Sequence, residues 1–182
     1  MRKEKGGKME IKFKGQVHKY GDNINTDVII PTRYCTTIEP SELAVYCLHD
    51  LDAAFAQRLN PGDILVAGYN FGCGSSREVA PLAIQASGIS CIIAASFARI
   101  FYRNAINIGL PIIECPRLVH ETSNGHWLEI NFDKSCIYSI TTGESYSFQT
   151  AGAEIQEIIR SGGLINYIKK TLEKKRIPIP RV

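Results

Sequence analysis

Residues 70–78, NFGCGSSRE, bring together residue types that bind anions, and we refer to them as the glycine turn. Two glycines, the second of them Gly74, let the backbone turn sharply and let a ligand come close. Ser75 and Ser76 supply hydroxyl groups, and Arg77 supplies a guanidinium that matches a carboxylate or a phosphate. An apolar stretch precedes the turn and a helical pattern follows it, so a helix start would add N–H groups and a positive dipole. The segment therefore predicts an anion site between a strand and a helix.

A turn that merely leads into a helix is the plainer interpretation, and Gly-Ser-Ser alone favours it. Arg77 argues against that interpretation, because a cation at the positive end of a helix dipole needs an anion to compensate. That anion is either Glu78 or a bound ligand. The turn is not a P-loop, since no lysine stands at the required place. It is not a dinucleotide-binding motif either, since Arg77 occupies the position of the third glycine.

A second polar segment, NINTDVIIPTRY, covers residues 23–34. Its Asn and Asp residues predict a loop, and residues 28–30 predict a short buried strand or a turn that ends at the following proline. Arg33 suits a two-pronged contact with a carboxylate. A surface arginine after an Asx-rich turn is the plainer alternative.

The composition excludes several other kinds of protein. The net charge of +3 is too small to indicate nucleic-acid binding, and no apolar run is long enough to cross a bilayer. The six cysteines lack C-x-x-C spacing, and the four histidines are scattered, so we expect no metal site and no cofactor on this chain. A charged N-terminus without an apolar segment predicts no secretory signal and a cytoplasmic location.

The elements that position the glycine turn follow from periodicity and from glycine and proline breaks. Alternating apolar and polar residues predict a half-buried strand at residues 11–18. From residue 64 on, strands at residues 64–68, 91–95 and 110–115 alternate with helices at residues 78–87 and 97–108, which predicts parallel strands covered by helices. Ser96 is the predicted cap of the second of these helices, and Ser41 that of an earlier helix. Short strands at residues 127–132, 136–140 and 145–148 and helices at residues 153–161 and 164–175 complete the pattern. We expect one domain over residues 1–182, with a loose extension at 1–9 and a tail at 176–182.

Two blocks carry a resemblance to a known family: GDNINTDVIIPTRY, and GYNFGCGSSREVAPLAIQASGISCIIAASFARIFYRNAINIGLPIIE. They closely resemble the small subunits of 3-isopropylmalate dehydratases, which are the detached swivel domain of the aconitase superfamily. The resemblance implies a swivelling β/β/α fold, a mixed sheet or barrel flanked by helices. It also implies a large-subunit partner that carries a 4Fe-4S cluster on its own cysteines.

The resemblance assigns a role to each residue of the glycine turn. Ser75 would be the general base, and Ser76 with the N–H groups of the turn, including that of Gly74, would steady the oxyanion. Arg77 would hold a carboxylate of the hydroxy-diacid substrate. These roles suit the chemistry, because a serine hydroxyl is a poor base until positive potential stabilises its alkoxide.

The resemblance also points to substrate contacts in the second polar segment. Asp27 falls at a Thr-Asp motif of the family, and Arg33 lies in the part that approaches substrate. Family members differ after a shared tyrosine, in the segment that meets the variable group of the substrate, here Tyr34, Cys35, Thr36 and Thr37. An arginine in that segment is typical of homoaconitase-like members, and its absence here disfavours a third substrate carboxylate.

We therefore expect the small subunit of a hydro-lyase that interconverts 2-isopropylmalate and 3-isopropylmalate in leucine biosynthesis. The polar residues after the tyrosine leave open a related dehydratase, such as one for 2,3-dimethylmalate or a homoaconitase. An alternative from another class is a stand-alone anion-binding or regulatory module without a catalytic partner.

Overall fold

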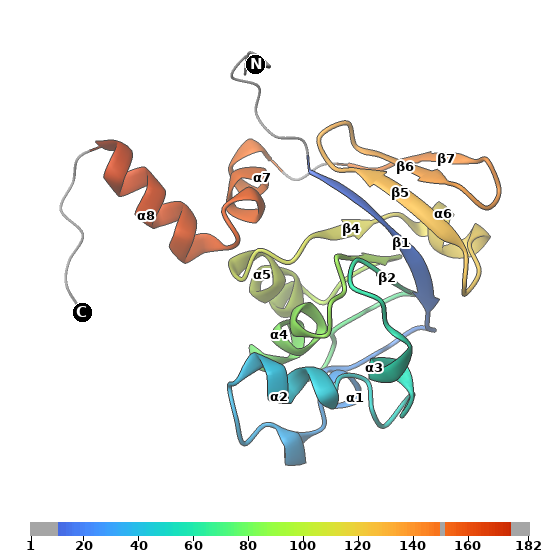
Figure 1. The fold of residues 1–182 in the computed structure, drawn as a ribbon, viewed down its shortest axis with the longest axis horizontal. Coiled ribbons are helices and arrows are strands. Elements are labelled where there is room, and N and C mark those ends of the chain that lie inside the picture. The colour runs from blue at the N-terminus through green and yellow to red at the C-terminus, as the bar shows by residue number, and fades with distance from the viewer. Residues whose placement is uncertain (1–10, 150–151, 176–182) are drawn as a thin grey trace, which may run out of the picture.

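The computed structural model describes residues 11–149 and 152–175, and a seven-stranded mixed sheet runs through this part of the chain (Figure 1). The strand order is β4-β3-β2-β1-β5-β6-β7. The strands are β1 Lys12–Lys19, β2 Ile64–Ala67, β3 Cys91–Ala94, β4 Ile112–Glu114, β5 Trp127–Asn131, β6 Cys136–Ser139 and β7 Ser145–Ser147. β1 to β4 pair in parallel, whereas β5, β6 and β7 extend the sheet in antiparallel fashion from β1. The prediction of a mixed sheet with a parallel half is confirmed.

The helices alternate with the parallel strands and continue after them. They are α1 Thr26–Ile29, α2 Pro40–Val45, α3 Phe55–Arg58, α4 Val79–Ala86, α5 Arg99–Asn107, α6 Pro116–Glu121, α7 Ala153–Arg160 and α8 Leu164–Lys175, with a 3-10 turn at Thr32–Tyr34. Figure 1 shows α1 to α5 gathered on one side of the parallel strands and β5 to β7 with α6 on the other. The parallel strands therefore have protein on both faces.

The two faces of β2 belong to different hydrophobic clusters. Leu65 and Ala67 face the cluster built with α1 to α5, and Ile64 and Val66 face a cluster that contains residues of β5 and β6. All four side chains are completely buried. Burial on both faces explains why the strand is an unbroken apolar run rather than an alternating one. The second cluster also shows that the antiparallel half curls over the parallel half, as in a half-barrel.

Of the two alternatives predicted for residues 28–30, the strand is wrong, because Val28 and Ile29 belong to the single helical turn of α1. Asn25 begins the helix, and its side-chain oxygen accepts a hydrogen bond from the Val28 amide at 2.8 Å. Ile29 is completely buried against the core. A side-chain cap and one buried contact therefore outweigh the strand preference of β-branched residues.

The two predicted serine caps are also wrong. Glu39, without a side-chain capping bond, precedes α2, so Ser41 lies inside the first turn of that helix. Ala98 precedes α5, and the Ser96 hydroxyl instead accepts a hydrogen bond from the Asn70 amide at 2.9 Å. Ser96 therefore supports the glycine turn rather than a helix.

Some expectations have a different outcome. Helix α6 was not predicted, because its six residues are too few to show a helical period. The expectations for residues 1–9 and 176–182 lie outside the described residues, and a single domain over residues 1–182 stays a prediction.

Candidate active site

The glycine turn leaves the carboxyl end of β2 and is held against the chain just before α1. The Gly72 amide donates to the Ile24 carbonyl at 2.7 Å, and the Thr26 amide donates to the Cys73 carbonyl at 2.8 Å. Gly72 and Gly74 have φ of +77° and +92°, in the left-handed region that favours glycine. Two backbone bonds and two left-handed glycines thus fix the path of the turn.

An aromatic side chain lies directly beneath the turn. A Cβ atom on Gly72 would lie only 2.2 Å from Cγ of Phe101 in α5. The Phe101 ring meets Phe71 edge-on at 5.2 Å and stacks with Phe97 at 6.3 Å between centroids. Glycine at position 72 therefore lets the turn rest on a packed aromatic cluster.

Both serines of the turn are exposed, and α4 begins only at Val79. The carbonyl oxygen of Ser75 accepts two hydrogen bonds, from the Thr26 hydroxyl at 3.0 Å and from the Arg77 amide at 2.8 Å. The backbone of Ser75 is therefore anchored while its side chain lies at the surface.

The Arg77 side chain is only 17% exposed, and three acceptors hold its guanidinium. Nη1 donates to the Ile30 carbonyl at 3.1 Å, and Nη2 donates to Oγ1 of Thr32 at 2.8 Å. Nη2 also lies 2.5 Å from Oδ1 of Asp27. The hydrogen bond from Arg77, followed by that from Thr32, lowers the pKa of Asp27. Asp27 is thus an anionic partner of Arg77, whereas the sequence predicted Glu78 or a ligand as the compensating anion.

Arg33 is exposed and forms a two-pronged ion pair with Asp50, and one of its bonds is 2.9 Å long. Its guanidinium carbon lies 4.6 Å from the centroid of the Tyr34 ring. The hydrogen bond from Arg33 is the largest cause of a lowered pKa at Asp50. In this structure Asp50 therefore neutralises the charge of Arg33.

Four of the predicted substrate-binding residues line one pocket of about 370 Å³, formed by Arg33, Tyr34, Thr36, Thr37, Glu42, Val45 and Tyr46. The rings of Tyr34 and Tyr46 stack at 3.8 Å and are nearly parallel. Cys35 lies apart from the lining, since its Sγ approaches the Pro31 carbonyl at 3.6 Å and its side chain packs against the core. Thr32 bonds to Arg77 and directly precedes Arg33, so this pocket adjoins the glycine turn.

Three lining residues of this pocket, Glu42, Val45 and Tyr46, were not predicted from the sequence. They lie three and four positions apart, which places them on one face of α2, whereas Leu43 is buried. The spacing indicates that the three residues share one helix face. It does not indicate which segment of the chain packs against that face.

Residues 4–118 match the aconitase C-terminal domain family. The chain belongs to this family. It is 58% identical over 159 residues to the 3-isopropylmalate dehydratase small subunit of Ruminiclostridium cellulolyticum, covering 87% of this chain and 98% of the relative. It is 55% identical over 161 residues to the 2,3-dimethylmalate dehydratase small subunit of Eubacterium barkeri, covering 88% and 99%. This aconitase-family chain is thus related to small subunits of dehydratases, which are hydro-lyases.

A solved structure supports the same assignment. The crystal structure of 3-isopropylmalate dehydratase from Methanocaldococcus jannaschii matches with a TM-score of 0.86 at 44% sequence identity, covering 91% of this chain and 99% of that one. The predicted aconitase-like swivel fold is confirmed. The family match over residues 4–118 includes α1, the glycine turn and the pocket beside it, so every predicted site residue lies within it.

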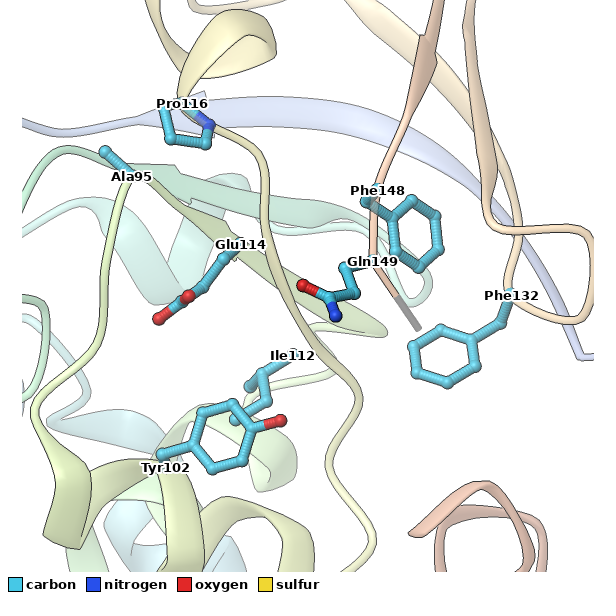
Figure 2. Close-up of a pocket in the computed structure, with 8 residues that line it drawn as sticks. All are labelled: Ala95, Tyr102, Ile112, Glu114, Pro116, Phe132, Phe148 and Gln149. Atoms are coloured by element: carbon cyan, nitrogen blue, oxygen red, sulfur yellow. The ribbon is translucent and has the colours of Figure 1, made fainter. Parts of the chain in front are cut away.

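A second pocket of this aconitase-family domain, of about 360 Å³, contains none of the predicted site residues. It is lined by Ala95, Tyr102, Ile112, Glu114, Pro116, Phe132, Phe148 and Gln149 (Figure 2). Figure 2 shows the Tyr102 hydroxyl and the Gln149 amide directed into the same space, with the two phenyl rings to one side. Burial and the nearby Glu114 raise the pKa of Tyr102. Glu114 accepts a hydrogen bond from the Phe97 amide at 3.2 Å, so its carboxylate is partly engaged in holding the start of α5.

Among the described residues, no group of three or more His, Cys, Asp or Glu side chains is placed to hold a metal ion. No helix in the same part of the chain is long and apolar enough to cross a membrane.

Proposed function

We propose that this chain is the small subunit of a two-subunit hydro-lyase that interconverts 2-isopropylmalate and 3-isopropylmalate by dehydration and rehydration, a step of leucine biosynthesis. The observation that carries the proposal is the pairing of an exposed Ser75 with Arg77, whose guanidinium is fixed two residues away. The 58% identity to a 3-isopropylmalate dehydratase small subunit supports the choice of reaction.

Dehydration of a hydroxy diacid requires removal of a weakly acidic C–H proton beside a carboxylate. In this proposal Oγ of Ser75 takes that proton, because Ser75 is exposed like Ser76 but also has its carbonyl anchored by two hydrogen bonds. The positive potential that stabilises the alkoxide comes from Arg77, the amides of the glycine turn, including that of Gly74, and the amino end of α4. Ser76 would add a hydroxyl to the same oxyanion site.

Arg77 would bind a substrate carboxylate in a fixed orientation. A guanidinium has five N–H donors, and the contacts with Ile30, Thr32 and Asp27 use at most three of them. The Nε hydrogen and one hydrogen of Nη1 therefore remain as donors for the substrate, and charge-assisted hydrogen bonds of this kind bind a carboxylate well. Asp27 would orient the arginine and contact the substrate beside it.

We propose a large-subunit partner that carries a 4Fe-4S cluster, which when bound supplies a Lewis acid for the leaving hydroxyl. The cysteines of this chain do not fit a cluster, because Cys47, Cys91 and Cys115 are buried in the apolar core at separate places. All six cysteines are unpaired, which also supports a reducing, cytoplasmic location.

The pocket beside the glycine turn favours a substrate with an apolar side group. A third substrate carboxylate in this pocket would lie near the carboxylate of Glu42 and be repelled by it. Arg33 would not offset this repulsion, because its charge is already paired with Asp50. Val45 and the Tyr34 ring suit an isopropyl group. They also suit the methyl groups of 2,3-dimethylmalate, and the 55% identical relative makes that substrate the second candidate.

The substrate test mixes the purified pair of subunits anaerobically with 2-isopropylmalate, 2,3-dimethylmalate and homocitrate, and follows the unsaturated acid by its ultraviolet absorbance. We expect isopropylmalate to give the highest kcat/KM. Glu42→Gln should raise the relative kcat/KM for homocitrate by removing a like charge, whereas Glu39→Gln, outside the pocket lining, should leave it unchanged. Equal effects of the two variants would contradict the role of Glu42.

Ser75→Ala tests the base. We expect turnover to fall by about 10³-fold, within the range for loss of a general base, and assembly with the large subunit to persist because Ser75 is exposed. Ser123→Ala, an exposed serine outside the glycine turn, is the control. Retained turnover in Ser75→Ala would refute the assignment of the base. If no cluster-bearing partner co-purifies and no hydroxy diacid is turned over, the chain is an anion-binding module instead.

A further inference from the structure

Thr26 is a buried polar residue to which the mechanism above gives no task. It is only 2% exposed and opens helix α1. Its hydroxyl donates to the carbonyl oxygen of Ser75 at 3.0 Å, and its amide donates to the Cys73 carbonyl at 2.8 Å. The Thr26 side chain thus ties the first helix to the glycine turn 49 positions later in the sequence.

We propose that Thr26 is a positioning residue for Ser75, an inference that rests on the proposed role of Ser75 as the base. The Ser75 carbonyl accepts from both Thr26 and the Arg77 amide, so both of its lone pairs are engaged. Because the Ser75 side chain is exposed, these backbone contacts fix the point from which its hydroxyl reaches substrate. Loss of the Thr26 hydroxyl would leave only the bond from the Arg77 amide to hold that carbonyl, so the peptide would be less firmly oriented.

Helix α1 contacts the glycine turn at a second place, through Asp27 and Arg77. Asp27 directly follows Thr26, and its carboxylate lies 2.5 Å from Nη2 of Arg77. The helix is itself held by the Asn25 cap and by the completely buried Ile29. Consecutive residues on one rigid turn therefore set the distance between the base and the carboxylate-binding arginine.

Thr26→Val tests the proposal, because valine keeps the shape of threonine and removes only the donor. We expect kcat of the reconstituted pair to fall about 10- to 100-fold, as for a small misplacement of a reacting group. KM should change less than about two-fold, because the Asp27 contact with Arg77 is retained. The deuterium isotope effect on kcat, with substrate labelled at the carbon that loses its proton, should rise as proton transfer slows. Thr26→Ser, which keeps the hydroxyl, should recover kcat to within about three-fold of the unaltered pair.

Thr122→Val is the matched control. Thr122 is also a buried threonine, 4% exposed, and its hydroxyl lies 3.3 Å from Nδ1 of His126, in the connection between α6 and β5. This variant loses a buried hydroxyl far along the chain from the glycine turn. It should therefore leave kcat and the isotope effect unchanged.

The outcomes separate this inference from the proposed function. Thr26→Val behaving like Thr122→Val, while Ser75→Ala is inactive, overturns the role of Thr26 and leaves the base intact. Full activity in Ser75→Ala overturns the assignment of the base, and with it the positioning role of Thr26. If Thr26→Val does not assemble, Thr26→Ala and Thr26→Ser decide: equal kcat in these two variants overturns the role of the hydroxyl, and a loss confined to alanine supports it.

Discussion

Gly72→Ala isolates the closest contact in the glycine turn. Alanine at a φ of +77° costs about 1–2 kcal/mol for the left-handed backbone. Its Cβ would lie 2.2 Å from Cγ and 2.4 Å from Cβ of Phe101, so the turn and α5 must move apart, and overpacking of this kind costs about 1–3 kcal/mol. The free energy of unfolding should therefore fall by about 2–5 kcal/mol, a large share of the roughly 5–15 kcal/mol typical of a domain.

The assay is urea unfolding of the isolated chain followed by circular dichroism, with Gly74→Ala as the comparison. Gly74 has a φ of +92°, but a Cβ there would find its nearest neighbour, Oγ1 of Thr26, at an ordinary 3.5 Å. Gly74→Ala should therefore show only the backbone cost of about 1–2 kcal/mol. The difference between the two variants measures the collision with the ring.

A double variant makes the test decisive. In a Phe101→Ala background the ring is gone but the Cβ of residue 101, which lies 2.4 Å from the added Cβ, remains, so Gly72→Ala should cost less than in the unaltered chain and more than the backbone strain alone. The reasoning fails if Gly72→Ala is no worse than Gly74→Ala, or if its cost is the same with and without the Phe101 ring.

Two further predictions concern charged side chains. Arg77→Lys keeps the charge but loses the guanidinium that bonds Thr32 and Asp27. We therefore expect KM to rise by about ten-fold or more in steady-state kinetics. An unchanged KM would contradict carboxylate binding by Arg77. The hydrogen bond from Arg58 is the largest cause that lowers the pKa of Asp52 to about 2 from an ordinary 3.8. A lowered pKa stabilises the fold fully above about pH 4, and the contribution is lost as the pH falls toward 2. Urea midpoints of the unaltered chain should therefore fall over this window more than those of Asp52→Asn, and parallel curves would refute the effect.

The parallel half of the fold was predictable because each of its elements is locally encoded. Strands at residues 64–68 and 91–95 are unbroken apolar runs bounded by glycines or polar turns, and the helix after the glycine turn has its own period. Helix α1 was not predictable in the same way, because the Val28, Ile29 and Ile30 run has the composition of a strand. Its conformation depends on a cap and on tertiary burial.

The site was predictable in its residue types and less so in its contacts. An anion was expected beside Arg77, and the local candidate was Glu78. The partner is Asp27, fifty positions earlier, which only the pairing of α1 with the glycine turn brings near. Glu42 was not predicted as a pocket residue, because the packing of α2 against the 3-10 turn is a tertiary contact that local periodicity does not indicate.

The central place of β1 has a consequence for how this protein is made. One edge of β1 pairs with β2, where Val17 lies opposite Ile64. The other edge pairs with β5, where Phe13 lies opposite Ile130, more than a hundred residues later in the sequence. On a ribosome, β1 to β4 and the glycine turn can assemble while one edge of β1 is still bare, and the hairpin strands close that edge only near the end of synthesis. We therefore expect nascent chains halted before β5 to be prone to edge-to-edge association, and the last third of the polypeptide to act on its first strand as a protective cover.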